Sequence, residues 1–226
     1  MGPLLLSIFS LVATATLGPI HAVEYIVTNE AVGTTGGDRF NNEVGADFTK
    51  QVMEGASTFI WQTFRQGEGD RKNFDQVVMN VKTMEGNAVA VTLGNKINYS
   101  ADSIAVSKGD LKDMVTGVLY HEMAHVWQWF GNQQTPSGLI EGIADFVRLK
   151  SGYPDPNWVK PGEGKNWDEG YSVTARFLDY CNSLKDGFVA DLNGKMRNGY
   201  SNDFFMEILG KTVDQLWADY KAKYGS

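Results

Sequence analysis

The sequence predicts an α+β fold, with a small mixed β-sheet in the N-terminal half and mostly helices after it. Three observations favour this class. A chain of 226 residues suits one well-buried domain. Short runs in which apolar and polar residues alternate, as in half-buried strands, gather before residue 106, and helical spacing dominates beyond it. No internal repeat or linker divides the chain, so we expect a single domain.

The first 22 residues differ from the rest of the chain and predict a cleaved secretory signal. The stretch from Pro3 to Ile20 carries no charge, and the small residue Ala22 precedes a polar start. A membrane anchor is the alternative, but the apolar core is short and is interrupted by Ser, Thr, Gly and Pro. We therefore expect residues 23–226 to form a secreted, extracellular domain that has no membrane association after cleavage.

The N-terminal half is predicted to contain one helix among several strands. Val23 to Thr28 alternates as an edge strand, and the Gly-rich segment Gly33 to Asn42 is expected to be a loop. Apolar residues at helical spacing predict an amphipathic helix from Val44 to Gln66. Three further strands are expected, with turns at Gly86-Asn87 and Gly94-Asn95, over Phe74 to Met84, Ala88 to Leu93 and Ile97 to Val106.

The C-terminal half begins with a long helix. Either Asp110 or Ser107 can cap its start, and we expect it to run to Phe130 and to end at Gly131-Asn132. A proline-containing loop is predicted from Gly152 to Gly164. Further helices are expected over Ser137 to Ser151, Glu169 to Ser183, Val189 to Arg197 and Thr212 to Tyr224.

The long helix contains the run His121-Glu122-Met123-Ala124-His125, which holds both histidines of the predicted mature chain. Two histidines four residues apart share one helix face, so both imidazoles can bind one Zn²⁺. Glu122, beside the first histidine, can act as the general base toward a water on that metal. The pattern therefore predicts a zinc hydrolase whose active-site helix supplies the metal ligands His121 and His125 and the catalytic residue Glu122.

A catalytic zinc ion needs a third protein ligand and one open position. Glu141, which fifteen residues separate from His125, is the best candidate. Asp145 follows four residues later and can accept the free ring N–H of a ligand histidine, but it is also the rival third ligand. This pairing behind the histidine motif resembles the gluzincin arrangement with a shorter spacer. We expect Arg148 to form an ion pair with Asp145, with a substrate carboxylate as its alternative partner.

The chain also resembles the plant basic secretory protein family, zincin-like peptidases of plants and bacteria. The likeness rests on a long central motif and extends over nearly all of the mature chain. Its segments are Tyr25 to Asn29, Arg39 to Glu43, His121 to Trp129, Gly138 to Arg148 and Trp167 to Leu178. The resemblance implies a zincin-like metallopeptidase domain over residues 23–226. It also implies an extracellular, defence-related enzyme, in the apoplast if the chain is from a plant.

Tyr171 is the second catalytic candidate. It resembles tyrosines that donate a hydrogen bond to the developing oxyanion in other zincins. The alternative is a buried tyrosine that packs in the core of the domain.

Composition limits the partners. The chain has 20 basic and 27 acidic residues, a formal charge of −7, which argues against nucleic acid as a partner. A single cysteine, Cys181, excludes an internal disulfide. The histidine motif together with the family resemblance implies a secreted zinc metallopeptidase that binds a peptide or protein substrate, and we expect a monomer. The alternative is a zinc-containing extracellular defence protein that binds a ligand or a microbial protein with little turnover. The intact Glu122 argues against that alternative, because a pure binder needs no base beside the metal.

Overall fold

The computed structural model describes residues 22–225 and confirms the α+β class, with a small mixed sheet that precedes the central helix and a mostly helical C-terminal half. The predicted signal segment, apart from Ala22, lies outside the described residues. The elements are β1 (Glu24–Asn29), α1 (Thr35–Arg39), a π-helical turn (Phe40–Val44), α2 (Ala46–Thr63), β2 (Gln76–Lys82), β3 (Ala90–Leu93), β4 (Lys96–Ser100), α3 (Ala101–Val106), α4 (Leu111–Trp127), α5 (Ser137–Lys150), α6 (Tyr171–Leu184), α7 (Phe188–Lys195), α8 (Asp203–Leu209) and α9 (Val213–Tyr224).

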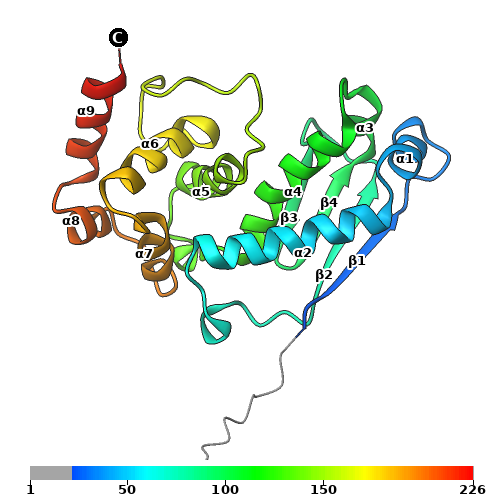
Figure 1. Cartoon of the computed structure of the whole chain (residues 1–226), viewed down its shortest axis with the longest axis horizontal. Coiled ribbons are helices and arrows are strands. Elements are labelled where there is room, and N and C mark those ends of the chain that lie inside the picture. Colours follow the sequence, from blue (N-terminus) through cyan, green and yellow to red (C-terminus); the bar gives the residue numbers. More distant parts are fainter. Residues whose placement is uncertain (1–21, 226) are drawn as a thin grey trace, which may run out of the picture.

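The two halves of the molecule meet along α4. Figure 1 shows the sheet with α2 in one half and helices α5 to α9 in the other. Helix α4 lies between them and contacts β3, α2 and α5. No described helix is long and apolar enough to span a bilayer.

The sheet is four-stranded and mixed, as predicted. Its strand order is β1-β2-β4-β3; β1, β2 and β4 run parallel, and β3 pairs antiparallel with β4. Period-2 burial puts Val77, Met79 and Val81 of β2 into the core while their neighbours point away. The expected edge position of the first strand is confirmed, and β3 forms the opposite edge. The free edge of β3 faces the region that holds the histidines.

The Gly-rich segment Gly33 to Asn42 is not the predicted loop, because tertiary contacts stabilise helix α1 and the π-helical turn there. Thr34 accepts a hydrogen bond from the Gly37 amide and caps α1. Gly36 packs directly on the carbonyl of Ala101, where no side chain would fit. Arg39 donates to the carbonyls of Ile104 and Ser107 at the end of α3. These long-range contacts offset the low helix propensity of glycine.

The predicted strand from Ile97 to Val106 is half wrong. The strand ends at Ser100, whose hydroxyl accepts from the Ser103 amide and begins α3. Two smaller differences are that α2 begins at Ala46 rather than Val44 and that the short helix α8 was not expected; neither helix start has a side-chain cap. The other predicted helices, and the loop from Gly152 to Gly164, are confirmed within a few residues.

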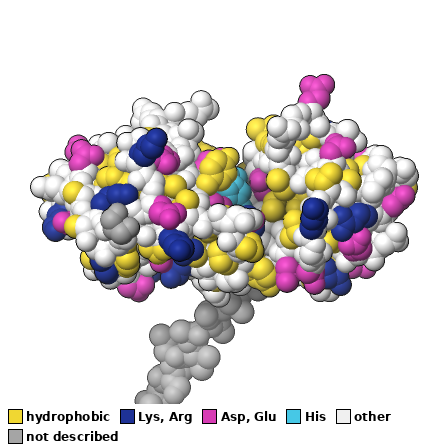
Figure 2. All heavy atoms as spheres, turned by 90° about the horizontal axis from the view of Figure 1, so that it is seen from above, with side chains coloured by type: hydrophobic (Ala, Val, Ile, Leu, Met, Phe, Trp, Pro, Cys, Tyr) yellow, Lys and Arg dark blue, Asp and Glu magenta, His cyan; other side chains and the backbone are white. Residues whose placement is uncertain are grey.

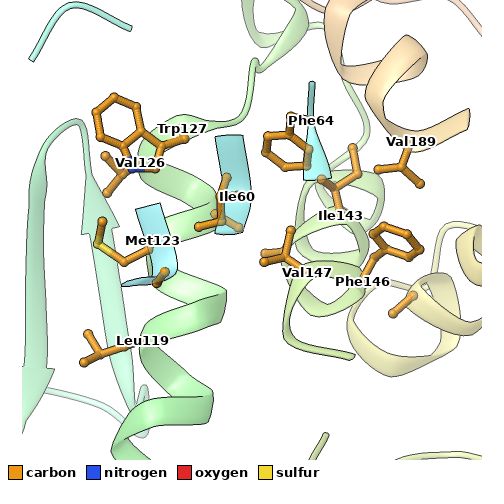
Figure 3. Packing of buried hydrophobic residues seen from close by; sticks show 14 of the residues in the cluster. Ile60, Phe64, Leu119, Met123, Val126, Trp127, Ile143, Phe146, Val147 and Val189 are labelled. Atoms are coloured by element: carbon orange, nitrogen blue, oxygen red, sulfur yellow. The ribbon is translucent and has the colours of Figure 1, made fainter. Parts of the chain in front are cut away.

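Helix α4 is capped by Asp110, which accepts from the amides of Lys112 and Asp113. It ends at Trp127, three residues earlier than predicted, because Gln128 is extended and turns its side chain back toward the helix. Its C-terminal half is buried on nearly all sides. Figure 3 shows apolar side chains along α4 that pack toward the sheet, with Ile60 of α2 and Val147 of α5 on the other side.

Helices α5 and α6 approach closely because Gly142 of α5 faces α6 and Gly138 faces the segment that leads into it. A Cβ added to Gly138 would lie 1.8 Å from the carbonyl oxygen of Asp168, and one added to Gly142 would lie 2.2 Å from Cγ2 of Thr174. Thr174 cannot give way easily, because its hydroxyl donates to the Trp167 carbonyl and accepts from the Gly170 amide. This close packing fixes α5 relative to the start of α6.

Gly138→Ala should therefore lower the free energy of unfolding by about 1–3 kcal/mol, the usual cost of overpacking against a backbone that cannot move. Gly55→Ala is the matched control: it lies in an exposed part of α2 with nothing within 4 Å of the added Cβ. The control should stabilise the protein by up to about 1 kcal/mol through helix propensity. Urea denaturation measures both changes, and equal effects of the two substitutions would contradict the packing argument.

Candidate metal centre

Helices α4 and α5 bring three possible metal ligands together at the junction of the two halves. His121 Nε2, His125 Nε2 and one carboxylate oxygen of Glu141 all lie within 4.8 Å of one another. The two imidazole nitrogens are 3.0 Å apart, and Glu141 Oε2 lies 3.2 Å from His121 Nε2 and 3.5 Å from His125 Nε2. The structure thus gathers the three residues that the sequence singled out as metal ligands.

The geometry of this group fits a zinc ion. Ligand atoms about 2.0–2.1 Å from a tetrahedral zinc lie roughly 3.3 Å from one another, close to the three separations above. The group combines two imidazole nitrogens and one carboxylate oxygen, which are ordinary zinc donors, and no fourth His, Cys, Asp or Glu of residues 22–225 joins it.

The histidines and carboxylates of this group shift one another's pKa values. Burial raises the pKa of the Glu141 carboxyl, but hydrogen bonds to His121 and His125 outweigh this and hold the pKa well below its usual value. Burial also opposes protonation of His121, yet hydrogen bonds to Asp145 and Glu141 raise its pKa to about 9. The histidines thus stabilise the anionic form of Glu141, and the two carboxylates stabilise positive charge on His121.

Asp145 lies outside this ligand group. Its Oδ1 is 2.6 Å from Nδ1 of His121, the ring nitrogen that faces away from Glu141. Only 3% of Asp145 is exposed, so the contact is shielded from water. A carboxylate in this position fixes the imidazole tautomer and makes Nε2 a better metal ligand. The geometry therefore matches the supporting position expected for Asp145, rather than that of the rival third ligand.

Gln128 supports the second histidine in the same way, and the sequence did not single it out. Its side-chain amide lies 2.7 Å from Nδ1 of His125 and is fully buried. A histidine that binds metal through Nε2 carries its proton on Nδ1, so Gln128 must turn its carbonyl oxygen toward that N–H. In the present amide orientation the Gln128 oxygen has no partner, while the amide nitrogen also donates to the Ile140 carbonyl at 3.3 Å, a contact that the rotation would give up. In the sequence, only the position of Gln128 three residues after His125 could have indicated this contact.

Glu122 has a partner that the sequence also did not reveal. The Thr92 hydroxyl donates to Glu122 Oε2 at 2.6 Å, and it lies 3.3 Å from the Glu122 carbonyl. Thr92 is on the edge strand β3, thirty residues earlier in the chain. Glu122 itself is buried and is not a member of the ligand group. Its carboxylate is thus fixed in orientation and remains free of the metal position.

Tyr171 lies beside the ligand group rather than in the core. Its ring stacks on that of His121 with centroids 6.1 Å apart and planes 8° apart, and 58% of the residue is exposed. The expectation that it packs in the core is therefore wrong. Tyr171 has a φ of 45°, unusual for a residue other than glycine, at the first position of α6. The side chain of Tyr171 is thereby directed to the same cleft as His121.

An open cleft gives access to these groups. Its volume is about 670 Å³, and its walls come from β3, α4, α5, the loop after α5 and the start of α6. Figure 2 shows a notch between the two halves of the molecule with histidine at its base. Arg148 lines the cleft, but the predicted ion pair with Asp145 is wrong, because the Asp145 carboxylate is engaged by His121.

The fold and the site define the chain as an α+β protein with a possible metal-binding site: two helix-borne histidines and a carboxylate lie beside a glutamate in an open cleft. The particular family follows from sequence comparison. The family described as "Peptidase of plants and bacteria" (BSP) matches residues 20–220, and the chain belongs to it. It is also similar to a basic secretory protease of Boswellia serrata, with 54% identity over 59 residues, which cover 26% of this chain and 67% of the relative. No solved structure matches the chain.

Proposed function

We propose that this chain is a secreted zinc-dependent peptidase that acts outside the cell, with a role in defence. The observation that carries the proposal is the convergence of His121, His125 and Glu141 beside Glu122 in an open cleft. Membership of a peptidase family supports the reaction class, and the name of the relative from Boswellia serrata supports secretion. The sequence prediction of a signal over residues 1–22 is consistent with it.

His121, His125 and Glu141 would hold the zinc ion. A bound zinc ion would lower the pKa of a water molecule toward neutrality and polarise the scissile carbonyl. Glu122 takes the proton of the attacking water and passes it to the leaving amine. Asp145 would keep Nδ1 of His121 protonated, so that Nε2 is free to act as an acceptor for the metal. Gln128 would do the same for His125 once its amide is rotated so that the oxygen faces Nδ1.

The free edge of β3 suits an extended peptide. Among the described strands β3 pairs only with β4, so one row of its backbone N–H and C=O groups faces the cleft. A peptide added along this edge gains main-chain hydrogen bonds without sequence dependence. Thr92 lies on this strand and contacts Glu122, so a peptide on β3 passes beside the base. Tyr171 lies across the cleft, where its hydroxyl can donate to the developing oxyanion.

A second candidate is a zinc-containing defence protein that binds a ligand or a microbial protein with little turnover. The ligand group fits both functions. The observation against the second is the buried Glu122, held by Thr92, because a group that only binds needs no fixed base beside the metal. A measurement of catalytic turnover on peptides therefore distinguishes the two functions.

Removal of the metal should test the proposal. The protein purified with one zinc per chain is expected to cleave a mixed peptide library, to lose cleavage after treatment with a chelator, and to regain it when zinc is returned. Metal content by mass spectrometry and helix content by circular dichroism must be followed together, so that unfolding is distinguished from loss of the ion. Full cleavage by folded, zinc-free protein would contradict the proposal, and zinc without any cleavage would favour the binding protein.

Thr92→Val should lower kcat by about 10- to 100-fold and leave zinc content unchanged. Valine keeps the shape and the β propensity of threonine but removes a hydrogen bond to a charged group, a contribution of about 1.5–3 kcal/mol. Thr92→Ser retains the hydroxyl and is the matched control, with activity near that of the wild type. Equal kcat for Thr92→Val and the wild type would show that Glu122 does not depend on this contact.

A further inference from the structure

Arg148 lies on the same face of α5 as two residues of the metal centre. Glu141, Asp145 and Arg148 are at i, i+4 and i+7, and all three line the cleft. Arg148 is the one lysine or arginine among the described residues that line this cleft, whereas three acidic residues line it. Any anionic group that enters the cleft therefore meets a single permanent positive charge besides a bound metal ion.

The guanidinium of Arg148 is held firmly in this position. Its Nε donates to the carbonyl of Tyr153 at 2.9 Å, and the ring of Trp158 lies 5.4 Å from its central carbon. On the side of α4, Gly117 leaves the space that the guanidinium occupies. A Cβ at Gly117 would lie 3.0 Å from Nε and 3.1 Å from Nη2 of Arg148. The side chain is thus pre-positioned between two elements and does not need to be ordered by a ligand.

The terminal nitrogens of Arg148 have no protein partner among the described residues. No described carboxylate forms an ion pair with it within 4.0 Å, and its one hydrogen bond uses Nε. A guanidinium has five N–H donors, and the two terminal groups form a fork that fits a carboxylate. The contacts to Tyr153 and Trp158 explain how Arg148 holds the loop after α5, but they leave both terminal nitrogens without an anion in a side chain that lines the cleft.

We infer that Arg148 binds a carboxylate of the peptide substrate and so makes an acidic group near the scissile bond a determinant of specificity. This inference rests on the proposed peptidase function. Gly117, against which the guanidinium packs, lies one turn, roughly 6 Å, before His121 on α4. An extended peptide advances about 3.3 Å per residue, so the carboxylate belongs within about three residues of the cleaved bond. It is either an Asp or Glu side chain or the C-terminus of the peptide.

Matched peptides distinguish these two sources. One set is blocked at both ends and differs only by Glu or Gln at each position within three residues of the cleaved bond. A second set, without acidic side chains, differs only by a free or an amidated C-terminus. We expect the wild type to favour the carboxylate member of one set by about 10- to 100-fold in kcat/KM, as for a two-pronged hydrogen bond to a charged group.

Arg148→Met should bring the ratio of kcat/KM between the carboxylate peptide and its uncharged partner close to one, while cleavage of the uncharged peptide continues. Arg148→Lys should give an intermediate ratio. Arg176→Met is the matched control. Arg176 also uses Nε to bind a carbonyl of the loop after α5, that of Val159 at 3.3 Å, but it does not line the cleft. The control should keep the full ratio. Gly117→Ala, which retains the arginine but crowds it, should lower the ratio if Arg148→Met fails to fold.

Binding of the same peptides to the Glu122→Gln protein, followed by tryptophan fluorescence, gives a readout that does not depend on cleavage. The ratio of affinities should again favour the carboxylate and should be lost when Arg148→Met is added. A wild type that cleaves both members of each set equally would overturn the role of Arg148 and leave the peptidase function standing. If Arg176→Met lowers the preference for the carboxylate as much as Arg148→Met does, Arg148 acts only by holding the loop after α5 in place, and the inference is overturned. Failure of the zinc-loaded wild type to cleave any peptide would overturn both.

Discussion

Glu122→Gln is expected to abolish peptide cleavage while one zinc ion remains bound to each chain. Glutamine has the shape of glutamate and can still accept the hydrogen bond from Thr92, so the cleft keeps its form. It cannot take a proton from water, and a positioned general base contributes about 10²- to 10⁴-fold to the rate. Because Glu122 is not part of the ligand group, metal content should not change. Peptide hydrolysis and bound zinc, measured on the same preparation, test both halves of this expectation.

Glu54→Gln is a matched control for this substitution, because Glu54 is exposed on α2, away from the cleft. It should leave kcat and zinc content at their wild-type values. Cleavage by Glu122→Gln at the wild-type rate would require another base, and none of the remaining acidic residues of the cleft is free of a histidine partner. Loss of zinc together with activity would show instead that Glu122 stabilises the metal centre and is not only the base.

The parts of the site that were predictable from sequence depend on local geometry. Two histidines four residues apart must share a helix face, and a short turn after α4 returns the chain so that Glu141 meets them. Asp145 follows by the same helical spacing. These relations need no knowledge of the rest of the fold, and the structure brings all four residues together.

The residues that sequence reasoning missed depend on long-range or non-helical geometry. Thr92 reaches Glu122 only because β3 lies at the edge of the sheet beside α4, a position set by its pairing with β4. Gln128 reaches His125 because the helix ends at Trp127, three residues before the predicted end, and the chain turns away at Gln128. Arg148 was expected to pair with Asp145 from spacing alone, but the histidine competes for that carboxylate. The spacing of two residues along a helix does not show which of two neighbouring partners a side chain will contact.

The same limit applies to the fold. The strands and helices with clear periodicity were predicted nearly to their ends, whereas the Gly-rich helix α1 was not. Its stability comes from the contact of Gly36 with Ala101 and from the hydrogen bonds of Arg39 to α3, partners more than sixty residues away. Local propensity is a weak guide where such contacts decide the conformation.

Two isosteric substitutions on α5 should separate the third metal ligand from the residue that supports a ligand. Glu141→Gln removes the charge whose oxygen converges with both histidine nitrogens, and Asp145→Asn removes the charge beside Nδ1 of His121. A partner behind a ligand is worth about 10- to 100-fold in metal affinity, so Asp145→Asn should weaken zinc binding by that amount. Glu141→Gln should weaken it by more, because an anionic ligand itself is lost.

Competition with a chromophoric chelator measures both affinities on folded protein, and it does not require that a substrate be known. The order of the two effects decides between the residues: a larger loss for Asp145→Asn would make Asp145 the ligand and Glu141 its support. The structure argues against that reversal, because the Asp145 oxygen and the Glu141 oxygen contact opposite nitrogens of the same imidazole. The two nitrogens of one imidazole point in different directions, so the carboxylates beside them cannot both reach the same ion. Nε2 of His121 lies beside Nε2 of His125 and the Glu141 oxygen, and this is the side on which the ligand atoms converge.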